Sequence, residues 1–558
     1  MRTRRAGSFS GDQVNQFAAR LYAQPRGLNT PQGGRSRPGS TGGVDINRPR
    51  PEIRTVPQLL DWSASEFGSR QAYVEYGDSD RTAITWAQLA QRSAAVASLF
   101  AARGLQQGDV LCLLMGSSID YAICYHAALR LGAITSGINP RLGSRETESI
   151  FQRTGSVVSV VGDGLDTPAN WNGSKITMAE LRSSFDLRPL ESFPDLRSED
   201  PVAIVWTSGT TGVPKGAVFN HLNLMAVARA TGDLSAEGDR RLSPLPFAHV
   251  GYMTRAWDEL SKGITTVISP TPWNAQGAIS VLESEQVTVA QGVPTQWKLM
   301  LARDELSSVD LSSLRVAGTG GSAVSPELVR ELRTRLGCSV VVGYASTETA
   351  VISKSRIGDS DEEVALTVGQ AADGVEIKIV DSDLVQLPAG QIGTVMVRSE
   401  AAMVGYWGDQ QGTQISPKEG WISTGDLGRL DERGFLVLSG RQTEMYIRGG
   451  YNIYPVEVEA VLCEHPGISQ AAVVGVPDPV LGEIGVAFLV ASPSRAGVHP
   501  DSAELRAWCS SLLADYKRPD VFEYLESLPL TAMSKVDKAK LTLRAAELVA
   551  SMATKAGE

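Results

Sequence analysis

The chain has 558 residues, and its 42% hydrophobic and 20% charged content is typical of a folded globular protein rather than a disordered or fibrous one. Its 52 Lys and Arg against 62 Asp and Glu give a net charge of −10, which argues against nucleic-acid binding by bulk electrostatic attraction. No apolar stretch reaches the roughly 18 residues of a membrane-spanning helix, and five scattered cysteines without a C-x-x-C pair indicate neither a zinc site nor a disulfide framework, so we expect a cytoplasmic protein.

Residues 1–52 differ in composition from the rest of the chain. The first 50 residues hold nine arginines and two acidic residues, and residues 26–44 are rich in Gly, Pro and Ser. Such a segment buries too little apolar surface to offset the entropy lost on ordering, so we predict a disordered tail. Its Arg-rich composition also fits an organelle transit peptide, but the glycines from Gly33 onward would break the amphipathic helix of such a peptide.

From residue 53 onward, helical and strand-like patterns alternate. Thr85 and Gln88 form a capping box, which predicts a helix that runs to Gly104. Three further elements follow from the apolar spacing, namely a strand over 110–115, a helix over 121–131 and a strand over 157–161. This alternation predicts parallel strands that are covered by helices.

The most specific motif spans residues 204–216, I-V-W-T-S-G-T-T-G-V-P-K-G, which overlap an apolar strand over 203–206. Glycines let backbone N–H groups converge on phosphate oxygens, and the hydroxyls and ammonium add donors. Gly216 follows Lys215 where a Walker A loop needs Ser or Thr, so this is a different phosphate loop. We favour an anion-binding loop over a merely flexible one, with Thr207, Ser208, Gly209, Thr210, Thr211, Gly212 and Lys215 as its binding residues.

Between residues 369 and 440 the apolar period becomes two. Val375, Ile377 and Ile379 alternate with polar residues, and the turn at 431–434 predicts a hairpin. After Gly440 the pattern is a compact α+β one, with strands over 471–476 and 486–491. Two amphipathic helices are predicted there, with apolar faces formed by Val458, Val461 and Leu462 and by Leu505, Trp508, Cys509, Leu512 and Leu513.

The segment TSGTTGVPKG resembles the phosphate-binding signature of the adenylate-forming superfamily, which includes acyl-CoA synthetases, adenylation domains of peptide synthetases and luciferases. Four more segments match in the superfamily's order, namely G-Y-A-S-T-E at 343–348, S-T-G-D at 423–426, G-R with R-G-G-Y-N-I-Y-P within 440–455, and P-L-T-A-M-S-K at 529–535. The resemblance covers residues 55–545 and is strongest to acyl-CoA synthetases.

This resemblance implies an α/β fold with a large domain and a small mobile domain. Residues 53–440 would form a large N-terminal domain with parallel-rich αβ sheets and a small β-barrel-like part. Residues 441–558 would form a small mobile α+β domain that swings about a hinge near Arg441. Two positions depart from the superfamily's usual pattern, because Thr443 replaces Asp or Lys at the hinge and Ser534 replaces the glycine before Lys535.

The implied reaction has two halves. A carboxylate attacks the α-phosphate of ATP to give an acyl-adenylate and pyrophosphate, and a thiol then attacks that mixed anhydride. Neither half needs an enzyme nucleophile, in keeping with the lack of a Ser/His/Asp or Cys/His constellation in the sequence. Catalysis then depends on positioning and on neutralising charge on phosphate oxygens.

The resemblance also implies roles for single residues. Lys535 would bridge the substrate carboxylate and the α-phosphate, and Glu348 would hold Mg²⁺. Asp426 would accept hydrogen bonds from the ribose, Arg441 would reach the same nucleotide, and Tyr344 would pack against adenine. Thr210 would contribute to catalysis from the phosphate loop. The remaining nucleotide-binding residues would be Gly320, Gly321, Ser322, Gly343, Ala345, Ser346 and Thr347.

For the acyl group and the thiol the expectations are coarser. His249 matches a position that lies beside the acyl group in this superfamily, and it would also have a catalytic role. The other acyl-binding residues would be Val250, Gly251, Trp257 and Gly318, with Tyr252 and Val293 nearby. An amino-acid substrate needs a buried carboxylate for its ammonium, for which Asp258 is the nearest candidate, so we favour an acid with an uncharged acyl tail, either medium-chain, branched or aryl. Coenzyme A would contact Arg448, Gly449 and Gly450.

Three functions therefore stay open at this point. The favoured one is an acyl-CoA synthetase that uses ATP, Mg²⁺ and coenzyme A, since no carrier domain follows Lys535. The second is a stand-alone adenylating enzyme that loads an acyl or aryl acid onto a separate carrier protein. The third, of another class, is a non-catalytic nucleotide or acyl-adenylate sensor, against which the joint retention of Glu348, Asp426, Arg441 and Lys535 argues.

Overall fold

The computed structural model describes residues 52–77, 80–207, 214–270, 272–321, 324–408, 420–492, 499–531 and 536–556. These residues belong to two compact units, each described by itself below. The first unit comprises residues 1–228, 245–265 and 402–413, and the second comprises residues 229–244, 266–401 and 414–558. Almost all of the predicted N-terminal tail lies outside the described residues, and the domain boundary predicted at residue 440 stays a prediction. Within the described part of the chain, no helix has both the length and the apolar character needed to cross a bilayer.

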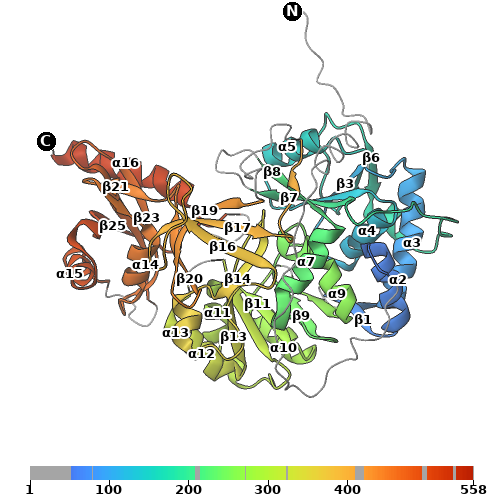
Figure 1. The fold of residues 1–558 in the computed structure, drawn as a ribbon, viewed down its shortest axis with the longest axis horizontal. Coiled ribbons are helices and arrows are strands. Elements are labelled where there is room, and N and C mark those ends of the chain that lie inside the picture. The colour runs from blue at the N-terminus through green and yellow to red at the C-terminus, as the bar shows by residue number, and fades with distance from the viewer. Residues whose placement is uncertain are drawn as a thin grey trace, which may run out of the picture. The chain divides into compact units, whose positions relative to one another are not determined.

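A mostly parallel sheet forms the centre of the first unit (Figure 1), in the order β18-β8-β7-β4-β3-β5-β6. β3 pairs in parallel with β4 and β5, while β8 pairs antiparallel with β7 and β18. Its strands are β3 (Val110–Leu114), β4 (Ile134–Ile138), β5 (Val158–Val161), β6 (Ser174–Thr177), β7 (Pro201–Thr207), β8 (Lys215–Asn220) and β18 (Gly405–Tyr406). β1 (Gln71–Tyr76) and β2 (Arg81–Thr85) pair antiparallel and do not belong to this seven-stranded sheet.

The two helices predicted in the first unit are present, each within two residues of its predicted ends. The predicted capping box is present, since the Gln88 N–H donates to the Thr85 hydroxyl at 3.2 Å and the Gln88 side chain accepts from the Thr85 N–H at 2.9 Å. The helices are α2 (Val56–Glu66), α3 (Trp86–Ala102), α4 (Ile119–Arg130), α5 (Ser144–Thr154), α6 (Met178–Ser183), α7 (His221–Thr231, which extends past the unit's end), α8 (Val250–Met253) and α9 (Ala256–Lys262). The predictions of a helix near 121–131 and of strands near 110–115 and 157–161 are confirmed, and each observed end lies within two residues of the predicted one.

The main sheet of the second unit has the order β15-β14-β13-β12-β11-β9-β10. β9, β11, β12 and β13 run parallel, whereas β13, β14 and β15 pair antiparallel. Its strands are β9 (Arg240–Ser243), β10 (Thr265–Ile268), β11 (Val289–Gly292), β12 (Val316–Gly320), β13 (Ser339–Ser346), β14 (Ala350–Lys354) and β15 (Gln370–Ala371). The helices are α10 (Ala275–Ser284), α11 (Pro294–Leu301), α12 (Pro326–Leu336) and α13 (Asp361–Leu366).

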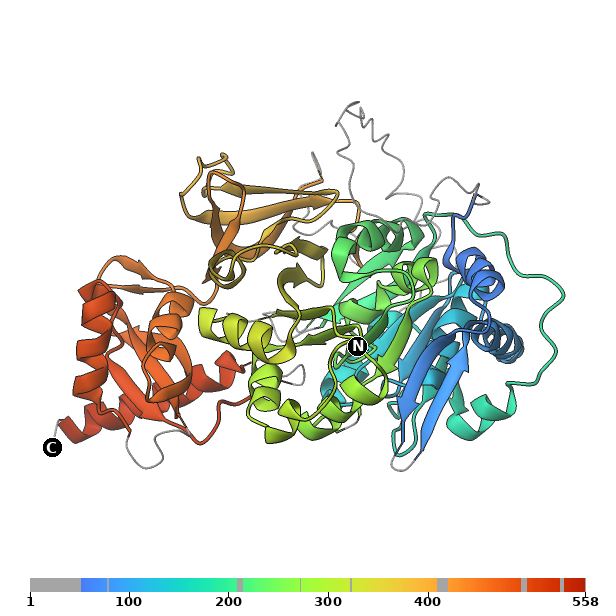
Figure 2. The same cartoon turned by 90° about the horizontal axis from the view of Figure 1, so that it is seen from below.

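The period-two region forms a four-stranded antiparallel sheet in the order β16-β17-β19-β20 (ochre to orange strands in Figure 2). Its strands are β16 (Val375–Val380), β17 (Gly393–Ser399), β19 (Ile422–Leu430) and β20 (Leu436–Arg441). The predicted hairpin is confirmed, because β19 and β20 pair across the turn that ends at Gly434, whose φ is +82°.

The C-terminal α+β part contains β21 (Tyr446–Arg448), β22 (Tyr451–Ile453), β23 (Ile468–Asp478), β24 (Gly482–Ala491), β25 (Val521–Tyr524), α14 (Pro455–Cys463), α15 (Ser502–Leu512) and α16 (Lys538–Ala556). Alternate residues of β23 and β24 face opposite sides of this sheet. Val473 and Ala487 pack against α14 and α15, whereas Val474 and Val486 pack against α16. Figure 1 shows α16 on the other side of this sheet from α14 and α15. The prediction for Leu512 is wrong. Its side chain is 50% exposed because α15 ends there, and Leu513, in extended backbone, packs against this core instead.

Candidate active site

Three parallel strands of the second unit, β11, β12 and β13, end at one edge of the sheet, where open α/β sheets bind ligands. Gly320 on β12 pairs with Gly343 on β13, and a Cβ atom at position 320 would lie 2.3 Å from the Gly343 carbonyl oxygen. Gly321 has a φ of +83°, which glycine adopts without strain. These predicted nucleotide-binding glycines therefore present bare backbone, while Ser322 lies outside the described residues.

Replacing Gly320 with alanine is expected to destabilise the second unit, because the added methyl group must push two paired strands apart. Gly318→Ala is the matched control on the same strand, since the nearest atom to its added Cβ would be Gln291 Cγ at 3.4 Å, an ordinary contact. We expect a loss of roughly 1–3 kcal/mol in the free energy of unfolding for Gly320→Ala and a smaller loss for the control. Urea denaturation measures both, and equal losses would contradict the close approach of Gly320 to Gly343.

Glu348 lies in the tight turn that joins β13 to β14. The Ser346 and Thr349 hydroxyls are hydrogen-bonded at 2.8 Å, and the Thr349 N–H donates to the Ser346 hydroxyl at 3.2 Å. Ala350 has a φ of +54°, a strained conformation for a residue with a side chain. Thr347 and Glu348 are half-buried between these fixed points. The turn therefore holds the predicted cation ligand in a constrained position.

Asp426 is held by two other residues that we predicted to bind the nucleotide. It lies on β19 opposite Arg441 on β20, and the Arg441 Nε–H donates to Asp426 Oδ1 at 3.2 Å. The Tyr344 hydroxyl donates a short hydrogen bond to Asp426 Oδ2. A register shift between Tyr344 and the exposed Ala345 locally bends β13, and Gly425, with a φ of +75°, precedes Asp426. The structure thus brings together three side chains from three separate segments.

The Asp426 carboxylate is 8% exposed. Burial raises the pKa of Asp426 above its ordinary value, although the Tyr344 hydrogen bond and the Arg441 charge act in the opposite direction. Burial and the neighbouring carboxylate also raise the pKa of Tyr344, so its hydroxyl stays protonated and continues to donate. A buried carboxylate with oxygen lone pairs still to satisfy suits the hydroxyl donors of a sugar.

The predicted phosphate loop joins β7 to β8 in the first unit. Thr207, at the end of β7, pairs with Lys215 at the start of β8, and its hydroxyl donates to the Lys215 carbonyl at 3.4 Å. The Lys215 Nζ lies 5.4 Å from the centre of the Tyr406 ring. The two ends of the loop are therefore adjacent. The predicted residues between them, Ser208, Gly209, Thr210, Thr211 and Gly212, lie outside the described part of the chain.

His249 caps the N-terminus of the short helix α8 in the first unit. Its Nδ1 accepts the Gly251 N–H at 3.1 Å, which fixes the plane of the ring. A side chain at Gly251 would meet Leu245 at 2.8 Å and His249 Nδ1 at 3.2 Å. Val250 and Trp257 are 5% and 9% exposed, so these two predicted acyl-binding residues are largely packed inside the unit.

Asp258 is fully buried, and its carboxylate is neutralised by two cations of the same helical segment. Arg255 Nη2 lies 2.5 Å from Oδ2, and Lys262 Nζ lies 3.1 Å from Oδ1. The neighbouring Glu259, 4% exposed, accepts a hydrogen bond from the Tyr73 hydroxyl at 3.2 Å. Asp258 is thus engaged inside the protein and is not an uncompensated partner for a substrate ammonium.

Trp297, on α11, was missed by the sequence reasoning. It is 2% exposed and donates its indole N–H to the Gly318 carbonyl at 3.1 Å. A Cβ at Gly292, on the neighbouring strand, would lie 3.1 Å from the same indole nitrogen. The indole ring therefore fills the space beside β11 and β12. A cavity of about 10 Å³ remains among Trp297, Trp273 and their neighbours.

The residues predicted to contact coenzyme A form a turn in the C-terminal part. Gly449 and Gly450 have φ values of +59° and +85°, and the Gly449 N–H donates to the Leu481 carbonyl at 2.8 Å. Arg448 donates to Asp520 through Nε at 3.0 Å and Nη2 at 2.7 Å. The arginine therefore anchors the base of this glycine turn.

The predicted C-terminal lysine loop has paired ends. Leu530 forms a β-bridge with Val536, and the Asp537 N–H donates to the Pro529 carbonyl at 2.8 Å. Lys535 itself lies outside the described residues. The structure thus fixes the residue that directly follows the predicted catalytic lysine.

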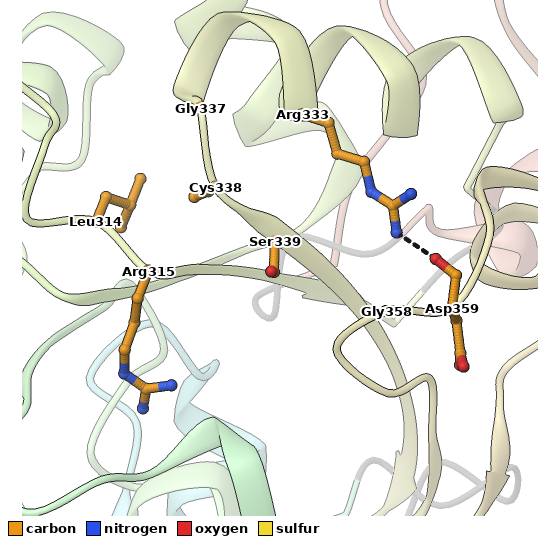
Figure 3. Close-up of a pocket in the computed structure, with 8 residues that line it drawn as sticks. All are labelled: Leu314, Arg315, Arg333, Gly337, Cys338, Ser339, Gly358 and Asp359. Atoms are coloured by element: carbon orange, nitrogen blue, oxygen red, sulfur yellow. Dashed lines mark hydrogen bonds between the residues drawn. The ribbon is translucent and has the colours of Figure 1, made fainter. Parts of the chain in front are cut away.

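An open pocket of about 530 Å³ lies apart from the predicted residues in the second unit (Figure 3). Its arginines are already paired. Arg315 Nε donates to Asp239 at 2.9 Å, and Arg333 binds Asp361 and donates to the Asp359 carbonyl at 2.8 Å. None of the predicted site residues lines this pocket, whose lining consists of Leu314, Arg315, Arg333, Gly337, Cys338, Ser339, Gly358 and Asp359.

Comparison with known proteins identifies the family. Residues 60–407 match the AMP-binding enzyme family, and residues 457–535 match the AMP-binding enzyme C-terminal domain. The chain is 31% identical, over 87% of its length and 97% of the relative's, to the 3-[(3aS,4S,7aS)-7a-methyl-1,5-dioxo-octahydro-1H-inden-4-yl]propanoyl:CoA ligase of Rhodococcus jostii. It is 30% identical, over 88% of its length and 96% of the relative's, to the fatty acid–[acyl-carrier-protein] ligase ScoC of Streptomyces coeruleorubidus.

A solved structure agrees with these matches. ATP-bound MatB from Rhodopseudomonas palustris superposes with a TM-score of 0.79 at 25% identity, over 88% of this chain and 99% of that one. The predicted superfamily and the α/β fold class are therefore confirmed. This chain belongs to the AMP-binding enzyme family.

Proposed function

We propose that the chain uses ATP to convert a carboxylic acid to an acyl-adenylate and then transfers the acyl group to coenzyme A. The observation that carries the proposal is the convergence of Tyr344, Asp426 and Arg441 next to the bare backbone of Gly320 and Gly343. The broader prediction, an ATP-dependent acid–thiol ligase, is confirmed by the family match and by CoA ligases among the relatives.

Different residues of the proposed nucleotide site bind different parts of ATP. Asp426 accepts the ribose hydroxyls, Arg441 keeps that carboxylate ionised and oriented, and the Tyr344 ring packs against adenine while its hydroxyl holds Asp426. The glycines at the end of β12 let the purine approach the backbone closely. The loop between Thr207 and Lys215 supplies backbone and hydroxyl donors to the phosphates.

Glu348 fits a magnesium ion that arrives with ATP. A half-buried carboxylate in a fixed turn, together with phosphate oxygens and water, is a usual magnesium environment. Among the described residues, no three His, Cys, Asp or Glu side chains converge on one point, which fits a cation carried by the nucleotide rather than a protein cage. When bound, the ion neutralises charge on the phosphates.

The two half-reactions need different groups. In the first, the substrate carboxylate oxygen attacks the α-phosphorus and pyrophosphate leaves, with Lys535 and Thr210 stabilising charge on the oxygens involved. In the second, the coenzyme A thiol attacks the acyl carbonyl, AMP leaves and the thiol proton is lost to solvent. Arg448, Gly449 and Gly450 shape the coenzyme A approach, and His249 lies beside the acyl group.

The substrate is a carboxylic acid whose acyl tail is uncharged, of the medium-chain, branched or aryl type. Support comes from Asp258, whose charge is neutralised by Arg255 and Lys262 and so offers no counter-ion to an amino acid. Val250, Gly251, Trp257 and Gly318 contribute apolar surface to the acyl site. The cytoplasmic location stays a prediction.

Trp297→Ala is expected to shift the acid preference toward longer or bulkier acids, because it removes the ring that fills the space beside Gly318. We expect kcat/KM for acids two or more carbons longer to rise relative to the best wild-type acid by roughly 10-fold. The control is Trp273→Ala, which enlarges the same cavity without touching the Gly318 carbonyl. If the acids keep the same order of kcat/KM in Trp297→Ala as in the wild-type protein, Trp297 does not line the acyl site.

Coenzyme A is favoured over a carrier protein as the acceptor. One relative is a ligase that loads an acyl carrier protein, so transfer to a carrier protein is the second candidate function. The test is a panel of carboxylic acids with ATP and Mg²⁺, run with and without coenzyme A, with pyrophosphate and acyl-CoA as readouts. We expect acid-dependent pyrophosphate and, with coenzyme A, acyl-CoA and AMP. Pyrophosphate without acyl-CoA indicates the carrier-loading reading, and ATP binding without pyrophosphate for any acid indicates a sensor.

A further inference from the structure

A half-buried ion cluster lies where the C-terminal helix α16 begins. The Nζ atom of Lys538 lies 2.8 Å from Glu444 Oε2 and 2.9 Å from Glu459 Oε1. The side chains of Lys538, Glu444 and Glu459 are 21%, 29% and 18% exposed, so all three charges are largely withdrawn from water. We call these three residues the Lys538 cluster.

The two ends of the cluster belong to functionally different segments. Glu444 lies three residues after Arg441, and its N–H donates to the Arg441 carbonyl at 3.0 Å in the turn that follows β20. Arg441 in turn binds Asp426. Lys538 lies three residues after Lys535, and its N–H donates to the Val536 carbonyl at 3.1 Å. A continuous chain of contacts therefore joins the proposed ribose carboxylate to the base of the lysine loop.

The third member anchors the cluster to the sheet. Glu459 is on α14, and the same Oε1 atom that faces Lys538 also accepts the Val473 N–H from β23 at 2.8 Å. Glu459 is thus fixed by backbone as well as by the ion pair. The position of Lys538 is therefore defined relative to both the sheet and the turn after Arg441.

We propose that Lys538 is a positioning residue for adenylation, which holds the base of the lysine loop against the turn after Arg441 so that Lys535 meets the α-phosphate. The inference rests on the proposed function, because Lys535 has this role only in an adenylating enzyme. Lys538 acts through Lys535 and does not itself contact the substrates.

The charge balance explains why the cluster would hold firmly. Burial alone lowers the pKa of the Lys538 ammonium, but Glu459 and Glu444 more than offset this, so the pKa lies above its ordinary value and the ammonium stays charged. Without the ammonium, two half-buried carboxylates would face each other and repel. The Glu444 turn and the start of α16 would then separate, and a displacement of about 1 Å costs up to roughly 100-fold in a positioned reaction.

The test compares Lys538→Met with Lys538→Arg and with the control Arg544→Met. Arg544 is on the same helix and pairs with Glu523, but it is more exposed and distant in sequence from Lys535. Adenylation is measured as acid-dependent exchange of labelled pyrophosphate into ATP, and thiolysis is measured with supplied acyl-adenylate and coenzyme A. We expect Lys538→Met to lose adenylation by roughly 10- to 100-fold with thiolysis within about 3-fold of wild type, and both controls to keep adenylation.

Glu444→Gln is the milder second variant, and it should give a smaller loss confined to adenylation. In a Lys535→Ala background, Lys538→Met should cause no further loss of adenylation, since the two residues act through one step. Equal losses in both half-reactions, or a Lys538→Met variant that matches Arg544→Met, would overturn the inference. No acid-dependent exchange in the wild-type protein would instead overturn the proposed function.

Discussion

Lys535→Ala is expected to reduce adenylation by roughly 10²-fold or more while thiolysis of a supplied acyl-adenylate stays close to wild type. In the proposed mechanism the ammonium is needed only while negative charge moves onto the phosphate oxygens, and removing one such stabilising group typically costs about 10²–10³ in rate. Pyrophosphate exchange measures the first half-reaction, and acyl-CoA formation from synthetic acyl-adenylate measures the second.

Lys540→Ala is the matched control for this variant. Lys540 is a nearby lysine whose ammonium lies 3.4 Å from Asp537 and is 68% exposed, so its loss removes the same charge from the same region of the chain. We expect its two half-reactions to stay close to wild type. An equal fall of both half-reactions in Lys535→Ala would contradict the assignment of this lysine to adenylation.

Asp426→Ala is expected to raise the KM for ATP by roughly 10- to 100-fold, because the proposed acceptor for the ribose hydroxyls is lost and Arg441 loses its hydrogen bond to this carboxylate. Initial rates at varied ATP, together with direct binding of ATP by calorimetry, measure the effect. Asp426→Asn keeps the shape and one acceptor oxygen, so its loss should be intermediate.

Tyr344→Phe separates the two proposed roles of this tyrosine, which are to orient the Asp426 carboxylate and to pack against adenine. It keeps the aromatic ring for adenine but removes the hydroxyl that donates to Asp426 Oδ2. We expect a rise in the KM for ATP smaller than that of Asp426→Ala, and little added effect of Tyr344→Phe in an Asp426→Ala background. If Asp426→Ala binds ATP with the same affinity as the wild-type protein, Asp426 does not belong to the nucleotide site.

Local patterns in the sequence were sufficient for single elements of the fold. The capping box at Thr85, the alternation around Ile377 and the hairpin before Gly434 depend on neighbours within a few residues, and each is present as predicted. Leu512 shows where this reasoning fails. Its spacing continues the apolar face, but the helix ends at that residue, and the extended backbone that follows lets Leu513 pack against the core instead.

The candidate site needed contacts that no local pattern contains. The motifs placed Tyr344 and Asp426 in one site, but the hydrogen bond between them joins residues 82 positions apart. Trp297 could have been noticed only as a large side chain five residues after Gly292, the glycine that ends β11, which is a weak signal by itself. Glu444, Glu459 and Lys538 are ordinary surface charges in the sequence, and only the tertiary fold makes them one cluster.

The most direct test of the account is a structure with ATP and a non-reactive analogue of the preferred acid bound. We predict that the ribose hydroxyls lie within hydrogen-bond distance of Asp426, that the phosphates lie in the loop between Thr207 and Lys215, and that Lys535 reaches the α-phosphate. A nucleotide bound elsewhere, for example in the pocket beside Arg315 and Arg333, with Asp426 still held only by Tyr344 and Arg441, would contradict it.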